Sequence, residues 1–157
     1  MKLYFKQRFM TFLDSYDIYD EAGQTVYTVE SELAWGRLMH VRGSSGNYLA
    51  SLKRKMWTML PTFLAYIGPN YAGTIKKEFT MMKPRYTVDY KGWRVEGNFM
   101  GFDYTVEDAA GQLVAVASKE LFHLTDRYCI DVLNPDDALD VLLLVLAIDA
   151  DKEDSGT

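Results

Sequence analysis

The sequence predicts a mainly β fold: a closed antiparallel barrel wrapped around one hydrophobic C-terminal helix. Two observations lead to this fold class. Short stretches of alternating apolar and polar residues recur along most of the chain and break at glycines, and one run of eight consecutive apolar residues, 141–148, stands near the C-terminus. A helix made of that run is apolar on every side and needs a complete apolar sleeve. A sandwich would leave such a helix half exposed, so a barrel is favoured.

The strands are expected to pair as hairpins. Residues 16–20 and 104–108 both alternate between apolar and polar side chains before a glycine. A period of two that breaks at glycine is typical of β-hairpins, because glycine adopts the positive φ that tight turns need. The glycines predicted at turns are Gly23, Gly46, Gly73, Gly92 and Gly111. They indicate about five hairpins, and hence about ten or more strands, with the last strand at 128–132.

The start of the helix is well specified. Asn134 is a good N-cap, and Pro135 suits the first helical position because its missing N–H would have no partner there anyway. Asp136 and Asp137 place negative charge at the positive end of the helix dipole. We therefore predict a helix that begins at Pro135.

The helix dipole also predicts an end near Ile148, because Asp149 and Asp151 would place anions at the negative end of the helix. From Pro135 to Ile148 the helix would be about 21 Å long at about 1.5 Å per residue, against roughly 30 Å for the hydrocarbon core of a bilayer. The apolar run is therefore predicted to be buried core, with no transmembrane span.

Length and composition predict one domain. The chain of 157 residues is long enough to bury a core, and its 14% of aromatic residues suit half-buried strands. We expect the domain to cover residues 1–149 and a polar acidic tail to cover 150–157. The single cysteine, Cys129, excludes an internal disulfide and lies in a strand pattern typical of quiet packing. No signal peptide is expected, because Lys6 interrupts the first apolar stretch, so the predicted compartment is the cytoplasm.

The net charge of −5 hides an uneven distribution of charged residues. Residues 1–52 carry five Lys or Arg and six Asp or Glu, residues 53–94 carry nine and two, and residues 95–157 carry three and fourteen. The middle segment is thus strongly basic and the last segment strongly acidic. Opposite faces of the molecule would then carry opposite charge, unless the charges interleave on the closed surface. The acidic last segment argues against an extended nucleic-acid track, and no nucleic-acid partner is predicted.

The basic middle segment provides the candidate ligand-binding residues. On neighbouring strands they would form one cationic face that binds phosphate groups, such as the headgroups of anionic lipids, through charge-assisted hydrogen bonds. The alternative is a solvated outer face. The candidate residues are Lys53, Arg54, Lys55, Lys76, Lys77, Lys83 and Arg85.

Met56 and Trp57, next to the first basic cluster, have two interpretations. Apolar side chains beside lysines are typical of a tip that enters a membrane surface. Strand core is the favoured interpretation of residues 56–60, because most apolar residues in such a chain are buried.

No catalytic residue, metal site or cofactor is predicted. His40 and His123 lie in no hydrolase or zinc motif, and the chain has no G-x-S-x-G sequence. The acidic residues of 149–154 lack the ordered spacing and the distal glutamate of a calcium loop, so they are predicted to be solvated. The protein is therefore predicted to be non-enzymatic.

Several short motifs occur in a fixed order along the chain. The unit Tyr-x-Ile/Val-x-Asp-x-x-Gly occurs at 16–23 and 104–111, Gly-Trp-Arg-Val-Glu-Gly at 92–97, Val-Ala-Val-Ala-Ser-Lys at 114–119, and Asp-Arg-Tyr-Cys-Ile-Asp-Val at 126–132. With the apolar helix that follows, they span almost the whole chain. In this order the motifs resemble the LURP-one-related family, which belongs to the tubby C-terminal-like superfamily together with the phospholipid scramblases.

The resemblance implies a closed barrel of about twelve strands around a central hydrophobic helix. It implies little about activity: members of the family are largely uncharacterised, tubby-type relatives bind phosphoinositides at membranes, and scramblase relatives are linked to lipid movement. We predict a barrel, peripheral at a membrane, that binds an anionic ligand such as phosphoinositide or phospholipid headgroups. The alternative is a protein-interaction or structural module with no lipid role. The sequence indicates neither a particular protein partner nor an oligomeric state.

Overall fold

The computed structural model describes residues 1–6, 15–34, 36–81, 83–121 and 127–154. Within these residues the chain forms twelve β-strands followed by a short 3-10 turn and one α-helix. The strands are β1 (Lys2–Phe5), β2 (Ser15–Tyr19), β3 (Thr25–Ala34), β4 (Gly36–Gly43), β5 (Tyr48–Arg54), β6 (Thr62–Ile67), β7 (Asn70–Thr80), β8 (Lys83–Val88), β9 (Trp93–Asn98), β10 (Asp103–Glu107), β11 (Leu113–Glu120) and β12 (Arg127–Val132). The helical elements are η1 (Pro135–Asp137) and α1 (Ala138–Asp154).

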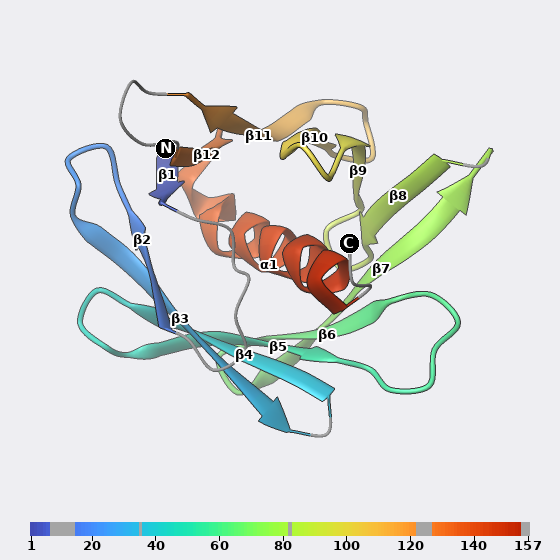
Figure 1. Ribbon diagram of the computed structural model, residues 1–157, viewed down its shortest axis with the longest axis horizontal. Coiled ribbons are helices and arrows are strands. Elements are labelled where there is room, and N and C mark those ends of the chain that lie inside the picture. Colours follow the sequence, from blue (N-terminus) through green and yellow to red (C-terminus); the bar gives the residue numbers. More distant parts are fainter. Residues whose placement is uncertain (7–14, 35, 82, 122–126, 155–157) are drawn as a thin grey trace.

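The strands form one closed antiparallel barrel (Figure 1). Each strand pairs with the next one in the chain, and the barrel closes where β1 pairs with β12, from Lys2 opposite Asp131 to Phe5 opposite Tyr128. Short turns between consecutive strands produce this order directly, and closure leaves no sheet edge along the seam between β1 and β12. The predicted fold class is confirmed.

Helix α1 lies inside the barrel and fills it (Figure 1). The side chain of Asn134 accepts a hydrogen bond from the N–H of Asp136 at 3.1 Å, and Pro135 begins the turn η1 that leads into the helix. Every residue from 141 to 148 is buried. The inward side chains of the strands, such as Val29 and Ile75, supply the apolar sleeve. The predicted N-cap and the buried run are therefore confirmed.

The predicted end of the helix near Ile148 is wrong, because α1 continues to Asp154. Asp149 and Asp151 are buried, not solvated. Basic side chains of the barrel wall, among them Arg37, reach this end of the helix and offset the unfavourable interaction between its carboxylates and the dipole. Residues 150–154 therefore belong to the helix, and residues 155–157 lie outside the described residues.

Four of the five predicted turn glycines, Gly23, Gly46, Gly92 and Gly111, do lie in turns with positive φ. Gly73 does not: it lies within β7, opposite Ala65, and the turn between β6 and β7 is at residues 68–69. A side chain at position 73 would collide with the carboxylate of Asp89 and the ring of Tyr90. This glycine is therefore required by a close approach within the wall and not by a turn.

Because neighbouring strands run in opposite directions, the loops gather at two ends of the barrel. Helix α1 starts at one end, beside the turns 20–24, 44–47 and 89–92, which we call the entry end. It stops at the other, beside the loop 55–61, the turn at 81 and the turn 99–102, which we call the exit end. In Figure 1, α1 runs from beside β12 toward β7.

Candidate functional site

The structure separates the seven predicted basic residues into three groups. Successive side chains of a strand point to opposite faces of the sheet, so neighbours such as Lys53 and Arg54 cannot share one face. The groups are an inner pair at the exit end (Arg54 and Lys77), an outer-wall group (Lys53, Lys76 and Arg85) and two exposed lysines beside the exit-end loops (Lys55 and Lys83). The sequence does not show this separation unless the strand boundaries are known.

The inner arginine is engaged with the helix. Arg54 forms an ion pair with Asp154, which also lies 3.2 Å from Nη2 of Arg37. Nη1 of Arg37 lies 2.7 Å from Oε2 of Glu153. Arg37 is only 4% exposed, and no local sequence motif singles it out. Arg54 therefore anchors the last turn of α1 and is not available to an external anion.

The inner lysine is engaged in the same way. Nζ of Lys77 lies 3.1 Å from Oδ2 of Asp151, a carboxylate that is 2% exposed. The hydroxyl of Tyr86 donates a hydrogen bond to the same oxygen. Burial raises the pKa of Tyr86, and the neighbouring Asp151 raises it further, so the hydroxyl stays protonated and keeps donating. These three residues, of which Tyr86 and Asp151 are buried and Lys77 is half-buried, form a polar cluster that holds α1 in the barrel.

On the outer wall, Arg85 is only loosely paired. Its Nη2 lies 3.3 Å from Oε2 of Glu78, and its Nη1 lies 3.8 Å from Oε1 of Glu96. Its Nε is buried without a hydrogen-bond partner among the described residues. The side chains of Lys53 and Lys76 make no ion pair within the part of the chain that the structure describes.

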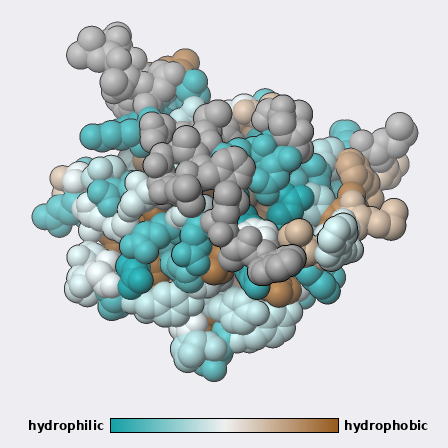
Figure 2. Space-filling model, turned by 60° about the horizontal axis from the view of Figure 1, so that its bottom comes forward, coloured by the Kyte–Doolittle hydropathy of each residue, from teal (hydrophilic) through white to brown (hydrophobic). Residues whose placement is uncertain are grey.

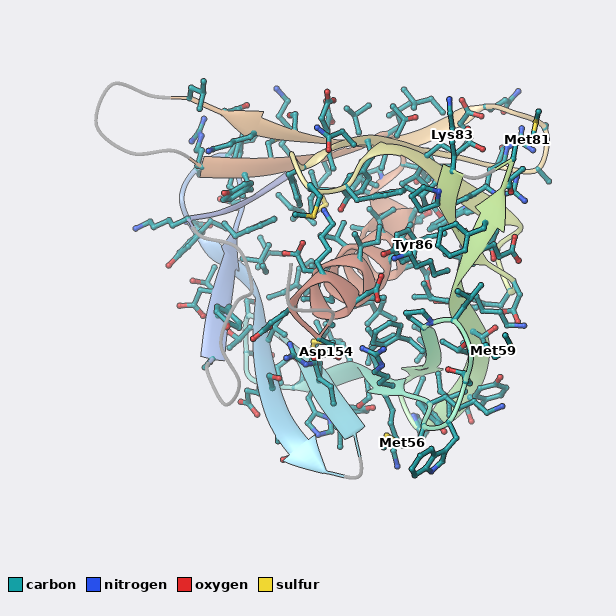
Figure 3. The ribbon with its side chains drawn as sticks, turned by 45° about the vertical axis from the view of Figure 1, so that its right-hand side comes forward. Met56, Met59, Met81, Lys83, Tyr86 and Asp154 are labelled. Atoms are coloured by element: carbon teal, nitrogen blue, oxygen red, sulfur yellow. The ribbon has the colours of Figure 1, made fainter. Side chains whose placement is uncertain are left out.

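The loops at the exit end carry large apolar side chains that face water. Trp57 is 96% exposed, Met81 is 92% exposed and Met59 is fully exposed. We call the exposed apolar residues of these three segments, the loop 55–61, the β7–β8 hairpin and the turn 99–102, the apolar rim: Met56, Trp57, Met59, Phe79, Met81 and Met100. Figure 3 shows Met56, Met59 and Met81 on the outside, away from the helix, and Figure 2 shows apolar surface at its right-hand edge. The predicted strand-core role of residues 56–60 is wrong, because they form a loop between β5 and β6.

Two residues of the apolar rim have unusual backbone conformations. Trp57 has φ of 61° and Met81 has φ of 48°, in the left-handed region that bulky residues rarely adopt. Lys55 and Lys83 are exposed beside them, and neither side chain makes an ion pair with a described residue. Backbone strain of this kind clusters at functional sites, where the surrounding structure holds it in place.

A groove of about 830 Å³ opens between the β7–β8 turn and β9. It exists because the pairing of β8 with β9 stops at Tyr86 opposite Val95. The N–H of Asp89 donates to the carbonyl of Thr74 in β7, so by alternation the backbone of Pro84 faces β9. Pro84 has no N–H to continue the ladder, and the two strands separate. The groove is lined by Thr80, Met81, Lys83, Pro84, Arg85, Glu96, Gly97 and Asn98.

A serine and a histidine meet on the outer wall, an arrangement that the sequence did not reveal because it spans three strands. Oγ of Ser51 lies 2.8 Å from Nδ1 of His40, whose Nε2 lies 3.7 Å from Oε1 of Glu32. Ser51 is 6% exposed, its oxygen is also bonded to the hydroxyl of Tyr48 at 2.5 Å, and it does not line the groove described above. A nucleophile needs an accessible substrate position, so we assign no catalytic role to this cluster.

The fold and the exit end together define a class of protein: a β-barrel whose interior is filled by its own helix, so that only its outer wall and its ends can meet a ligand. A family model described as LURP-one-related matches residues 1–149, and the chain belongs to this family. The resemblance seen in the sequence motifs is thus confirmed.

Two known proteins illustrate the relationship. The chain is 28% identical over 158 residues to a Bacillus subtilis (strain 168) protein named "Uncharacterized protein YxjI", covering 97% of this chain and 98% of that one. An X-ray structure of a protein from Arabidopsis thaliana matches with a TM-score of 0.64 and 16% identity, covering 94% of this chain and 90% of the other. The second likeness shows the fold alone. Among the described residues, no helix is both long and apolar enough to cross a bilayer.

Proposed function

We propose that this protein binds the surface of membranes that contain anionic phospholipids, and that it docks through its exit end. The observation that carries the proposal is the apolar rim, in which Trp57, Met59 and Met81 are almost completely exposed beside Lys55 and Lys83. Large apolar side chains on loops, flanked by lysines, are the combination that binds the interface of a bilayer.

The apolar part of the interaction comes from the rim. Tryptophan is enriched at the level of lipid headgroups, and methionine adapts to irregular apolar surroundings. Moving a Met or Phe side chain out of water contributes about 1.5–3 kcal/mol when burial is complete. Several partly inserted side chains would therefore contribute binding free energy that the isolated fold does not use.

The electrostatic part comes from the exposed lysines. Each Lys or Arg near an anionic leaflet contributes about 1 kcal/mol. Two carboxylates at the same end, Asp154 and Glu153, oppose this little, because they are already paired with Arg37 and Arg54. The net charge of −5 disfavours a purely electrostatic attachment, so the rim is needed as well.

Sedimentation with vesicles of phosphatidylcholine, with and without phosphatidylserine, tests the proposal. We expect binding to the anionic vesicles, weakened about tenfold by Trp57→Ala, since a buried aromatic anchor contributes more than 1 kcal/mol. The double variant Lys55→Glu, Lys83→Glu should weaken binding to anionic vesicles in particular. Matched controls lie at the entry end: Leu133→Ala removes an exposed apolar side chain, and Arg42→Glu reverses an outer-wall charge.

Two results would contradict the proposal. One is equal and negligible binding of the unmodified protein to both kinds of vesicle. The other is wild-type binding by the rim and lysine variants, which would place any lipid contact elsewhere. Absence of vesicle binding would favour the alternative of a protein-interaction module, whose partner would then use the same apolar rim.

A further inference from the structure

The groove between the β7–β8 turn and β9 has the chemistry of an oxyanion site, and we infer that it binds a phosphate group. Lys83 and Arg85 stand on its β8 wall, and Gly97 and Asn98 stand on its β9 wall. Its volume of about 830 Å³ is within the range of small-ligand sites. Figure 3 shows Lys83 on the outside of the hairpin, beside Met81 and away from the helix.

Arg85 has hydrogen-bonding capacity that its neighbours do not use. Charge-assisted N–H···O bonds are usually about 2.7–2.9 Å long. The contacts of Arg85 are longer, at 3.3 Å to Glu78 and 3.8 Å to Glu96, and its Nε has no hydrogen-bond partner among the described residues. The planar fork of a guanidinium matches two oxygens of a phosphate, which would satisfy donors that the carboxylates leave underused.

The other walls add donors and little competition. Lys83 is exposed, and its side chain makes no ion pair within the described part of the chain. The side-chain oxygen of Asn98 accepts a bond from the N–H of Gly101 at 3.0 Å, so its amide nitrogen is the group left to donate. Among the lining residues that the structure describes, Glu96 is the one carboxylate, and its distance from Arg85 makes it a weak competitor.

Phosphate is the shared chemistry of two sources, a lipid headgroup and a soluble phosphate. The groove opens beside Met81 of the apolar rim, so a headgroup could enter it from a docked membrane. Phosphate binding does not depend on docking, however, because a soluble phosphate would meet the same side chains.

NMR titration of the ¹⁵N-labelled protein with inorganic phosphate, at constant ionic strength against chloride, tests the site. We expect saturable shifts of the Arg85 Nε–H signal and of the Gly97 and Asn98 amides. Arg85→Gln and Lys83→Gln should each weaken phosphate binding about tenfold or more, as expected for the loss of a bond to a charged group. Glu96→Gln should strengthen it, and Arg94→Gln, an exposed arginine on the next stretch of β9, should not change it.

Vesicles containing phosphatidylserine separate the two sources. If Arg85→Gln weakens vesicle binding more than Arg94→Gln, the groove takes a headgroup; if it leaves vesicle binding intact but abolishes the phosphate shifts, the groove takes a soluble phosphate. Shifts that never saturate and are the same in Arg85→Gln and Glu96→Gln would overturn the inference, even where membrane docking through the rim is observed. Thermal unfolding of each variant checks that the barrel is intact.

Discussion

Asp151 shows how a single buried charge is accommodated at the end of this barrel. A carboxylate that is 2% exposed would be strongly destabilising if it were alone. Here it receives a hydrogen bond from Tyr86 and lies 3.1 Å from Nζ of Lys77. Each partner removes part of the cost of taking the charge out of water, and the three side chains together connect α1 to β7 and β8.

At this residue scale, Tyr86→Phe is expected to destabilise the fold by about 1–2 kcal/mol, because it leaves an oxygen of Asp151 buried with one partner fewer. Urea unfolding at neutral pH measures the change in the free energy of unfolding. Tyr71→Phe, which removes an exposed hydroxyl, is the matched control and should have no effect. Equal stability of the two variants would mean that the Tyr86 bond contributes nothing.

Asp89 should make stability depend on pH. Burial alone would raise the pKa of its carboxyl, but bonds from the N–H and hydroxyl of Thr74, both 2.7 Å long, outweigh burial and lower the pKa below 3.8. A carboxyl whose pKa is lower in the folded state stabilises that state at pH values above its pKa in the unfolded chain. This contribution is lost as the pH falls through its pKa in the folded state. Asp89→Asn should therefore cost more stability at pH 7 than below pH 3.8. Urea unfolding across this pH range measures the difference in the free energy of unfolding between the wild type and Asp89→Asn. A difference that stays constant with pH would contradict the expectation.

At the scale of elements, helix α1 acts as the core that the strands enclose. Its start follows from local residues, since Asn134 and Pro135 specify it in any context. Its end does not, because the cations that pair with Asp151 and Glu153 come from distant strands. Capping rules read only neighbours in sequence, whereas this helix end is set by tertiary contacts.

Leu144→Asp should unfold the domain. Leu144 is fully buried, and an unpaired charge there costs several kcal/mol, comparable with a total stability of about 5–15 kcal/mol. Circular dichroism and urea unfolding measure the loss. Leu133→Asp, at an exposed position beside the entry end, is the control and should remain folded. A folded Leu144→Asp variant would contradict the enclosed position of the helix.

The alternation of apolar and polar residues and the turn glycines predict the hairpins for most of the barrel wall but not for all of it. A glycine in a tight turn can be recognised from its neighbours in sequence. Gly73 cannot, because it is required by its close contact with Asp89 and Tyr90, which lie on a different part of the chain. The candidate site was harder to predict from the sequence than the strands were. A basic stretch of sequence identifies the cationic residues, but the strand boundaries are needed to know which of Arg54, Lys55 and Lys77 face the helix. The loop conformation is needed to know that Trp57 faces water.

At the scale of the whole molecule, the exit end carries the basic and apolar features while the chain as a whole is acidic. Binding to anionic vesicles should therefore have an electrostatic part, which salt weakens, and an apolar part, which salt does not screen. Raising NaCl from about 0.1 M to about 0.5 M shortens the screening length from about 10 Å to a few Å and should weaken binding without abolishing it.

The double variant Lys55→Glu, Lys83→Glu should show a smaller dependence on salt than the wild type, because the screened interaction has been removed. Trp57→Ala should bind less at every salt concentration yet keep the wild-type slope. Sedimentation across the salt series measures both slopes, and identical slopes for all three proteins would exclude a contribution from these lysines.

The order of the chain gives the central helix one more consequence, which concerns biosynthesis. A ribosome makes all twelve strands before it makes the 17 residues of α1. Until those residues emerge, the inner face of a nascent wall has no partner, and its apolar side chains are open to chaperones or to other unfinished chains. A premature stop just before residue 138 would thus spare every strand and still yield a polypeptide prone to aggregation. We therefore expect the wall to become stable only once α1 has been made.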